Sequence, residues 1–504
     1  MSMPAEQMQP DLTLSDLLRG YVDAPDLGVR GISSDSRTLV EGDLFLACEG
    51  INNHGIDFVD DAIEAGVVAI AYDSSTAKLP AREYPVPMLA IENLSKHLGN
   101  IANRFFGSPS VSVRVIGVTG TNGKTTVAWL IAQCLERLGE PCAYIGTLGS
   151  GIGEVELGEG MTTPATIEMH RQLAAFRDQG ARYAAVEVSS HALVQNRVDG
   201  IAFNTVLFTN LSRDHLDYHG DMQSYGDAKA RLFFEYSARQ RIINLDAEFG
   251  AQLAERCGDD VIAVSTDVTR RDNERPFVFL RRAVATATGF NLTVHSSWGD
   301  CEFELPLPGE FNIENALITL ALLLNQGVPI DKACAVLEDI QAPPGRMQRV
   351  VADIEQPAVY VDYAHSPAAL EVVLRSLGTH CSGKLWLVFG CGGDRDQGKR
   401  PAMGKVAASY ADRIIVTSDN PRTEAADEII AAIVAGVEKN SDLTVIEDRG
   451  AAIAWAIANA DEQDVILIAG KGHENYQIIG AESRDFSDLG AAAANLARRA
   501  RQPA

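Results

Sequence analysis

Residues 113–138 combine three features in a fixed order: an apolar run, a loop with glycines, and a helical stretch. The β-branched run from Val113 to Val118 predicts a buried strand. Apolar side chains then recur at helical spacing from Val127 to Leu138. In the intervening loop, Gly120-Thr-Asn-Gly-Lys-Thr-Thr126, glycines allow backbone N–H groups to approach a phosphate closely. The sequence therefore predicts a strand, a phosphate-binding loop and a helix.

The chemistry of this loop suits bound ATP. The helix N-terminus favours an anion, Lys124 can neutralise β- and γ-phosphate oxygens, and Thr125 can ligate magnesium. A tight turn with an exposed lysine is the alternative, and the order of strand, loop and helix argues against it. We predict ATP contacts from seven consecutive residues, Gly120, Thr121, Asn122, Gly123, Lys124, Thr125 and Thr126.

Two breaks divide the chain, whose 504 residues exceed what one hydrophobic core usually supports. Gly107-Ser-Pro-Ser110 follows a segment with short strand candidates at Asp43 to Cys48 and Val67 to Tyr72. Gln341-Ala-Pro-Pro-Gly345 is the second break, because its paired prolines cannot continue a helix. We predict three domains, at residues 1–110, 111–344 and 345–504.

Strand candidates alternate with helical stretches in the central and C-terminal segments, which is typical of mostly parallel sheets covered by helices. The central strands are predicted at Val113 to Val118, Ala143 to Ile145, Tyr183 to Val188, Val206 to Thr209 and Arg241 to Asn244. The C-terminal strands are predicted at Val359 to Tyr363, Leu385 to Phe389, Arg413 to Thr417, Thr444 to Glu447 and Val465 to Ala469. Polar and apolar residues alternate at Asn291 to His295 and Glu302 to Leu305, which predicts an edge hairpin.

The predicted fold class is therefore α/β in all three domains. We expect a small N-terminal α/β domain, a central P-loop mononucleotide-binding α/β domain and a C-terminal Rossmann-like α/β domain. In parallel sheets of this kind, ligand-binding loops follow the carboxyl ends of the strands. Functional residues are therefore expected directly after each predicted strand.

Composition limits the possible partners and the compartment. The net charge of -25, from 43 Lys and Arg against 68 Asp and Glu, argues against nucleic acid as a partner. The eight cysteines show no paired metal spacing and indicate reduced thiols. No basic segment precedes an apolar stretch at the start, and no run of 18 apolar residues follows. We expect a cytoplasmic monomer that acts on small molecules and has no membrane insertion.

Two motifs at the ends of central strands carry candidate metal ligands. Glu187 opens Glu187-Val-Ser-Ser-His-Ala-Leu193, and His215 lies in Asn210-Leu-Ser-Arg-Asp-His-Leu-Asp217. Solvated loop polarity is the alternative for either motif alone. Together with the phosphate loop they favour a magnesium–ATP site, because the three loops should meet at one edge of the sheet.

The run Gly117-Val-Thr-Gly-Thr-Asn-Gly-Lys-Thr-Thr126 departs from a standard Walker loop, which has glycine where this chain has Val118. With the Glu187 and His215 motifs, it resembles the Mur ligases, which add amino acids to the peptidoglycan precursor, and their folylpolyglutamate synthetase relatives. The resemblance covers nearly all of the chain. It implies an ATP-dependent ligase that activates a carboxylate as an acyl phosphate and joins it to an amine, with catalytic roles for Lys124, Glu187, His215 and Lys229.

The resemblance also implies the cofactors. Lys229 matches a family lysine that carries a CO₂-derived carbamate, whereas the sequence alone would suggest an exposed helix lysine. Two Mg²⁺ ions are implied, with ligands from Thr125, Glu187, His215 and carbamylated Lys229. Further nucleotide contacts are implied at Asn312 and Arg346, near family matches at Asn315 and Asp362. Helix capping and turn chemistry are the alternative roles of Asn315 and Asp362.

The most specific resemblance is to the branch that adds the third residue to UDP-N-acetylmuramoyl-L-alanyl-D-glutamate. Hydroxyls and an arginine suit a sugar acid and peptide carboxylates. The resemblance implies contacts with this acceptor from Ser34, Ser36, Asn52, Asn53, Thr162, Thr163, Ser189, Gln195 and Arg197.

Three motifs of the last segment follow strand candidates, so their loops should gather at one sheet edge. They are Gly390-Cys-Gly-Gly-Asp-Arg-Asp396, Asp419-Asn-Pro-Arg422 and Gly470-Lys-Gly-His-Glu474. Arginines suit carboxylates and Glu474 suits an ammonium group, as an amino acid charged at both ends requires. Asp419 to Arg422 resembles the meso-diaminopimelate-specific form of the family. We predict contacts with that amino acid from Arg395, Asp419, Asn420, Pro421, Arg422, Gly470 and Glu474.

Several alternatives stay open at this point. The nearest are relatives that add lysine, D-alanyl-D-alanine or polyglutamate. Arg422 disfavours the first, and Thr162, Gln195 and Arg197 together disfavour the others. A nucleotide-dependent switch or a partner-binding ATPase is a different class of protein. Phosphate release that depends on an added amine would exclude that class.

Overall fold

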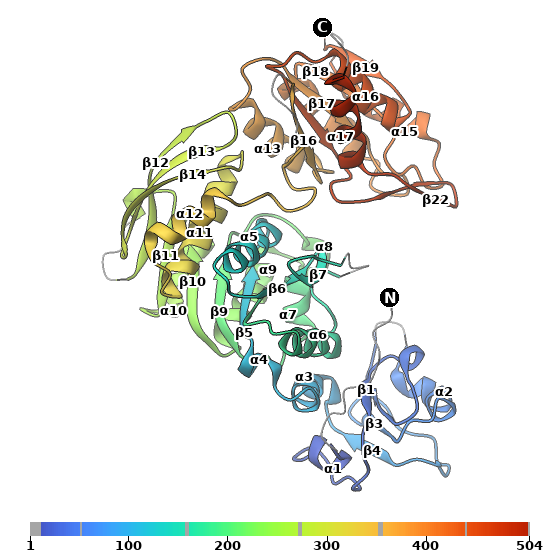
Figure 1. The fold of residues 1–504 in the computed structure, drawn as a ribbon. Coiled ribbons are helices and arrows are strands. Elements are labelled where there is room, and N and C mark those ends of the chain that lie inside the picture. The colour runs from blue at the N-terminus through green and yellow to red at the C-terminus, as the bar shows by residue number, and fades with distance from the viewer. Residues whose placement is uncertain are drawn as a thin grey trace. The chain divides into compact units, whose positions relative to one another are not determined.

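The computed structural model describes residues 12–50, 53–156, 161–270, 275–350, 356–438 and 441–501. Helices and strands alternate along most of this length (Figure 1). Within the described ranges, no helix is both long and apolar enough to cross a lipid bilayer.

The N-terminal segment forms a four-stranded parallel sheet with strand order β1-β2-β3-β4. Successive residues of a strand point to opposite faces, so Leu44 and Leu46 enter one buried cluster whereas Phe45 and Ala47 enter another. The predicted strands coincide with β2 and β3, and the short strands β1 and β4 were not predicted. The elements are α1 (Leu14–Leu17), β1 (Gly31–Ser33), η1 (Ser36–Thr38), β2 (Asp43–Ala47), η2 (Gly55–Phe58), α2 (Val59–Glu64), β3 (Ala69–Asp73), β4 (Met88–Ile91), α3 (Leu94–Phe105) and α4 (Pro109–Ser112).

The first part of the central segment contains strands in the order β9-β5-β8-β6-β7. All pair in parallel except β7, which is antiparallel to β6. The elements are β5 (Arg114–Thr119), α5 (Lys124–Arg137), β6 (Cys142–Gly146), β7 (Gly149–Ile152), α6 (Thr166–Asp178), β8 (Tyr183–Glu187), α7 (Ser190–Val194), β9 (Phe203–Phe208), α8 (Leu216–His219) and α9 (Met222–Phe234).

Strand β5 lies between β8 and β9, and this order positions the predicted motifs. Val118 near the end of β5 is in register with Glu187 on β8 and with Leu207 on β9. The phosphate loop, Glu187 and the segment after β9 therefore all start from one edge of the sheet.

The rest of the central segment contains the predicted hairpin. Strands β12, β13 and β14 pair antiparallel, and β11 pairs with β12 in parallel, so the hairpin prediction is confirmed. The elements are β10 (Ala238–Asn244), α10 (Glu248–Cys257), β11 (Val261–Ser265), η3 (Val268–Arg270), β12 (Phe277–Ala285), β13 (Phe290–Ser296), β14 (Gly299–Leu305), α11 (Glu310–Asn325) and α12 (Ile330–Glu338).

The C-terminal segment forms a six-stranded sheet with order β15-β16-β20-β17-β18-β19. Only the edge strand β15 is antiparallel to its neighbour. The elements are β15 (Gln348–Val350), β16 (Ala358–Asp362), α13 (Pro367–Gly378), β17 (Leu385–Phe389), α14 (Lys399–Tyr410), β18 (Arg413–Val416), α15 (Ala426–Val434), β19 (Leu443–Val445), α16 (Arg449–Asn459), β20 (Val465–Ala469), β21 (Tyr476–Ile479), β22 (Glu482–Asp485) and α17 (Asp488–Arg499).

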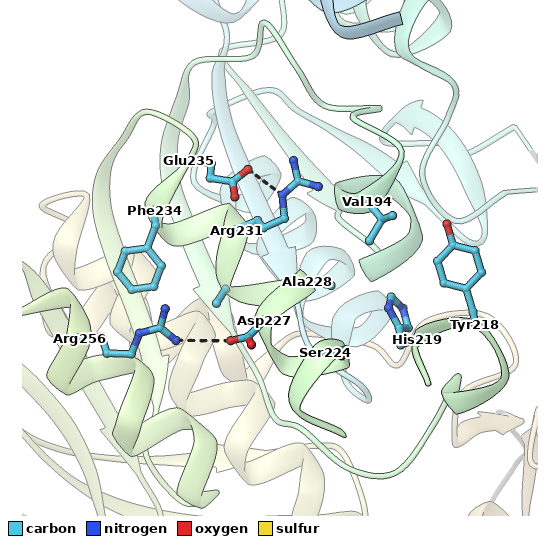
Figure 2. Close-up of a pocket in the computed structure, with 11 residues that line it drawn as sticks. Val194, Tyr218, His219, Ser224, Asp227, Ala228, Arg231, Phe234, Glu235 and Arg256 are labelled. Carbon is cyan, nitrogen blue, oxygen red and sulfur yellow. Dashed lines mark hydrogen bonds and ion pairs between the residues drawn. The ribbon is translucent and has the colours of Figure 1, made fainter. Parts of the chain in front are cut away.

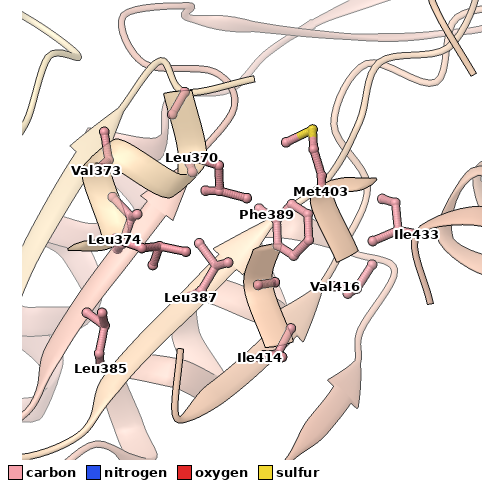
Figure 3. Packing of buried hydrophobic residues seen from close by; sticks show 14 of the residues in the cluster. Leu370, Val373, Leu374, Leu385, Leu387, Phe389, Met403, Ile414, Val416 and Ile433 are labelled. Atoms are coloured by element: carbon pink, nitrogen blue, oxygen red, sulfur yellow. The ribbon is translucent and has the colours of Figure 1, made fainter. Parts of the chain in front are cut away.

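Two apolar layers cover the faces of this sheet. Figure 3 shows one of them, in which Leu374 of α13 and Met403 of α14 pack against Leu387 and Phe389 of β17. On the other face, Val388 packs in a cluster with residues of α16 and α17. The α/β fold class is confirmed, and every predicted central and C-terminal strand lies on an observed strand to within a few residues at its ends.

A fully buried ion pair joins the strand ends of this sheet to α17. Arg449 donates from Nε and Nη2 to the two carboxylate oxygens of Asp488, each over 2.7 Å. Its Nη2 also donates to the carbonyl of Ala469, over 2.9 Å. Neither side chain of the ion pair has any exposure to solvent. The pair therefore fixes α17 and the end of β20 together.

We expect Arg449→Met to lower the free energy of unfolding by about 3–5 kcal/mol, because the Asp488 carboxylate would stay buried without its partner. Urea denaturation of the purified protein measures this loss. The double variant Arg449→Met/Asp488→Leu is the control and should be closer to wild type, since no charge remains buried. An equal loss in both variants would contradict this account.

Candidate active site

The phosphate loop has a backbone that only glycine fits at its first position. Gly120 has φ +149°, and a Cβ atom there would lie 1.9 Å from Thr209 Oγ1. The Lys124 ammonium folds over the loop and donates to the carbonyls of Gly120 and Thr121, over 3.0 and 2.9 Å. Asn122 N donates to Asn210 Oδ1 over 3.0 Å, which ties the loop to the segment after β9.

Lys229 lies against the same loop and is buried, with 1% of its surface exposed. Its Nζ donates to the carbonyl of Gly120 over 2.7 Å and lies 4.4 Å from the centre of the Tyr225 ring. Burial and the nearby Lys124 ammonium hold the pKa of Lys229 well below its ordinary value, against a smaller opposing effect of Asp214. The alternative of an exposed helix lysine is therefore wrong. A neutral amine is the form that combines with CO₂.

Glu187 is buried at the end of β8, and its carboxylate is held from two sides. Oε1 accepts from the backbone N–H of Thr147 over 2.9 Å and from the Tyr144 hydroxyl over 2.5 Å. Oε2 accepts from the Thr147 hydroxyl over 3.2 Å. A Cβ atom at Gly146 would lie 2.2 Å from Oε1, so glycine leaves the room that this carboxylate occupies. The side chain has one fixed orientation.

His215 belongs to a cluster of imidazole and phenol rings. It has φ 52° just before α8, and its ring centre lies 5.0 Å from that of His191. His191 lies 5.4 Å from His219, and His219 lies 5.0 Å from Tyr225. Burial and the neighbouring imidazoles lower the pKa of His191, while burial and Lys229 lower the pKa of His219. The neutral imidazole is thus favoured at His191 and at His219.

Five predicted acceptor contacts lie beside Glu187. Thr163 Oγ1 donates to the carbonyl of Glu187 over 2.7 Å and accepts from Ser189 N over 3.1 Å. Arg197 donates to the carbonyl of Thr163 over 3.0 Å and to Gln195 Oε1 over 2.9 Å. Thr162 Oγ1 accepts from the Thr147 hydroxyl over 3.1 Å. The structure therefore brings this group together at the edge that carries the phosphate loop.

The remaining predicted acceptor contacts lie in the N-terminal segment. Ser34 is exposed directly after β1, Ser36 opens η1, and Asn53 is exposed just before η2. Asn52 lies outside the described residues. Ser34 and Asn53 are exposed loop positions, and surface loops often carry binding residues.

Loops of the C-terminal sheet bring the predicted amino-acid contacts together. Asn420 Nδ2 donates to Glu474 Oε2 over 2.9 Å, and a Cβ atom at Gly470 would lie 2.7 Å from Asp419 Oδ2. Arg422, at φ 52°, donates to the carbonyl of Gly393 over 2.8 Å. Pro421 is buried, and Arg395 is exposed in the loop after β17. Both charge types predicted for an amino-acid pocket therefore lie on adjoining loops.

The further residues predicted to contact the nucleotide lie on α11 and near β16. Asn312 and Asn315 are buried within α11, and Asn315 Nδ2 donates to Asn312 Oδ1 over 3.1 Å, so the capping alternative for Asn315 is wrong. Asp362 accepts from the backbone N–H groups of Met347 and Ala364, both over 2.7 Å, as turn chemistry predicts. The Arg346 guanidinium lies 5.0 Å from the Tyr363 ring centre. Its buried Nε has no hydrogen-bond partner among the described residues.

Comparison with known proteins agrees with this arrangement. Residues 28–106 match the Mur ligase family catalytic domain, residues 118–323 the Mur ligase middle domain, and residues 345–472 the Mur ligase glutamate ligase domain. A UDP-N-acetylmuramoyl-L-alanyl-D-glutamate--2,6-diaminopimelate ligase of Pseudomonas putida is 45% identical over 467 residues, covering 92% of this chain and 93% of that protein. The chain belongs to the Mur ligase family.

Two further relatives carry the same name. The Haemophilus influenzae (strain PittEE) protein is 42% identical over 466 residues, which is 92% of this chain and 95% of its own length. A solved structure of such a ligase has TM-score 0.74 and 31% identity, and the likeness covers 98% of this chain and 100% of that one. The sequence predicted a Mur ligase with a three-domain α/β fold, and both predictions are confirmed.

The residues of this Mur ligase suit the implied magnesium and carbamate. Among the described residues, no three His, Cys, Asp or Glu side chains are grouped to hold a metal ion. Of these four residue types, the predicted magnesium ligands include only Glu187 and His215. A cation at this site would therefore also need hydroxyl, phosphate and carbamate oxygens as ligands. The depressed pKa of Lys229 and its 2.7 Å contact with the phosphate loop fit that requirement.

An open pocket of about 750 Å³ borders the histidine cluster of this Mur ligase (Figure 2). Tyr218 and His219 form one side, while helix α9 forms another. Its charged residues pair with each other, Arg231 with Glu235 over 2.7 Å and Arg256 with Asp227 over 3.8 Å. None of the predicted substrate contacts lines it, and the paired charges leave no excess positive charge for an anionic substrate.

Several side chains of the site were not singled out in the sequence. Thr147 and Tyr144 hold Glu187, and His191 and His219 surround His215. His191 was visible as the histidine of the Glu187 motif, and His219 as the histidine four residues after His215. No sequence signal pointed to Thr147, which meets Glu187 only through the pairing of β6 with β8.

Lys229 gives a pH-dependent prediction about stability. The pKa of Lys229 is lower in the folded chain than in the unfolded chain. Between these two pKa values the unfolded chain binds more protons at this residue. The contribution of Lys229 to the free energy of unfolding therefore rises with pH towards about 10.5. We expect Lys229→Met to exceed wild type in unfolding free energy most at neutral pH, with the difference shrinking by pH 10. Urea titrations in CO₂-free buffer measure it, with Lys96→Met on exposed α3 as control. A difference that does not change with pH would contradict the burial of an ionisable amine.

Proposed function

We propose that this Mur ligase adds meso-diaminopimelate to the D-glutamate of UDP-N-acetylmuramoyl-L-alanyl-D-glutamate, releasing ADP and phosphate, in peptidoglycan precursor synthesis. The observation that carries the proposal is the hydrogen bond from Thr163 to the Glu187 carbonyl, which joins the acceptor contacts to the phosphate-loop edge. The names of the relatives at 42–45% identity support the same reaction. We further infer a cytoplasmic monomer.

Each domain has its own substrate in this proposal. Residues 1–110 bind the uridine diphosphate through Ser34, Ser36, Asn52 and Asn53. Residues 111–344 bind ATP and the peptide end of the acceptor, and residues 345–504 bind the amino acid, with Arg346 reaching the nucleotide. Loops at the carboxyl ends of parallel strands support each assignment.

The first chemical step is attack of the D-glutamate carboxylate on the γ-phosphate. Lys124 neutralises phosphate oxygens, and the backbone N–H groups of its loop hold them in place. Arg197 binds an acceptor carboxylate, since its guanidinium is held beside Thr163 and Gln195. These contacts align two anions that would otherwise repel each other. The bond between the β- and γ-phosphates breaks, and the products are an acyl phosphate and ADP.

Two Mg²⁺ ions would be held by Thr125, Glu187, His215 and the carbamate of Lys229. When bound, they supply positive charge that offsets the repulsion between the two anions. Carbamylation turns a buried amine into an oxygen ligand, and the depressed pKa of Lys229 supports it.

The second step is attack of the amine on the acyl phosphate. Glu474 and Asp419 would hold an ammonium group of diaminopimelate, while Arg422 and Arg395 would hold its carboxylates. Lysine lacks the second carboxylate, so bound lysine would offer no carboxylate partner to Arg422.

The reaction is tested by incubating the protein with ATP, Mg²⁺, the UDP-muramoyl dipeptide and one amine at a time. We expect an amide product with meso-diaminopimelate, identified by its mass, and phosphate release that depends on the amine. L-Lysine and D-alanyl-D-alanine are the comparison amines. Phosphate release without any amide would instead indicate a nucleotide-driven switch and contradict the proposal.

We expect Arg422→Ala to raise the KM for diaminopimelate by about 10–100-fold, because a charge-assisted hydrogen bond to its carboxylate is lost. The KM values for ATP and for the dipeptide should stay unchanged. Steady-state kinetics with each substrate varied in turn measure this. Arg375→Ala, on the exposed side of α13, is the matched control. An unchanged KM for diaminopimelate would show that Arg422 does not bind it.

A further inference from the structure

Lys471 is a buried lysine among the predicted amino-acid contacts, and it is not itself one of them. Its side chain has no exposure to solvent. Nζ donates to Asn420 Oδ1 over 3.1 Å and to Glu474 Oε2 over 3.2 Å. Removing a lysine this completely from water is unfavourable unless its partners are fixed. The ammonium therefore depends on Asn420 and Glu474, and they depend on it.

The network decides which oxygen of Glu474 can meet a ligand. Oε2 accepts from Asn420 Nδ2 over 2.9 Å as well as from Lys471. Asn420 Oδ1 also accepts from the backbone N–H of Ile478 over 3.0 Å, which ties the loop after β18 to β21. Among the described residues, both hydrogen bonds to the carboxylate go to Oε2. Oε1 is thus the oxygen left for a substrate ammonium.

Lys471 also sets the net charge of the pocket. Glu474 has only 19% of its side chain exposed, so its charge is weakly screened, and the adjacent ammonium offsets it. meso-Diaminopimelate carries two ammonium and two carboxylate groups, whereas L-lysine has one carboxylate fewer and a net charge of about +1. A pocket with one negative charge more would attract lysine and repel the second carboxylate.

We propose that Lys471 is a positioning residue that sets amine selectivity: it fixes Glu474 through Oε2 and cancels its charge, so that the pocket takes a doubly zwitterionic amino acid over a cationic one. This inference rests on the proposed ligase function and adds a specificity determinant to it. It differs from the role of Arg422, which would contact the second carboxylate directly. Lys471 acts through Glu474 and does not touch the substrate.

The test is a competition assay with equal concentrations of meso-diaminopimelate and L-lysine, in which the ratio of the two amide products gives the ratio of kcat/KM. We expect Lys471→Met to lower this ratio about ten-fold or more, because Glu474 becomes an uncompensated charge. Glu474→Gln should raise the ratio, and Lys471→Met/Glu474→Gln should return it close to wild type. Lys405→Met, on the exposed side of α14, is the matched control and should leave it unchanged.

The order of the ratios separates this role from a structural one, because losing a contact shared by both amines cancels in the ratio. A general distortion would slow both products alike and would not be reversed in the double variant. Thermal denaturation shows whether Lys471→Met is folded. If it is not, the product ratio of the double variant must still be lower than that of Glu474→Gln, because the double variant removes both buried charges together. An unchanged ratio in these comparisons overturns the role of Lys471. Absence of any amide from the wild type overturns the ligase proposal instead.

Discussion

The parallel pairing of β5 with β8 and β9 is the constraint on which the candidate site depends. It puts Val118 in register with Glu187 and Leu207, so three loops start from one edge of the sheet. Parallel strands all end at the same side, which a hairpin arrangement does not provide. Hydrogen bonds from Asn122 to Asn210 and from Thr163 to Glu187 then join these loops to each other. The phosphate loop and the predicted acceptor contacts are therefore neighbours although they are far apart in sequence.

Three buried basic side chains have different partners and therefore different roles. Arg449 has a bidentate carboxylate partner and holds α17 to the C-terminal sheet. Lys229 is buried beside the Lys124 ammonium, and burial and that charge together hold its pKa well below its ordinary value, which favours the neutral amine. Lys471 is shared between the Asn420 amide and the Glu474 carboxylate, so it orients Glu474. In each case the partners, and not the cation itself, decide the outcome, because burial makes an unpaired charge unfavourable.

The position of each predicted strand followed from local sequence, since buried strands of a parallel sheet are short continuous apolar runs. Strands β1 and β4 of the N-terminal sheet were missed because such short runs carry little periodicity. The buried Asn315 of α11 could be mistaken for a cap, because capping and interior asparagines look alike in a sequence. The substrate contacts assigned by resemblance stay predictions, and Asn52 lies outside the described residues.

The sequence by itself determined the α/β class, the phosphate loop and the family, because strand runs, glycines and motif residues are local features. Only the tertiary structure decided that Lys229 is buried, that Thr147 and Tyr144 hold Glu187, and that Lys471 is shared by Asn420 and Glu474. The physical reason is that burial and charge pairing are properties of neighbours in space. Those neighbours come from strands that pair across long stretches of chain, and no local pattern records them.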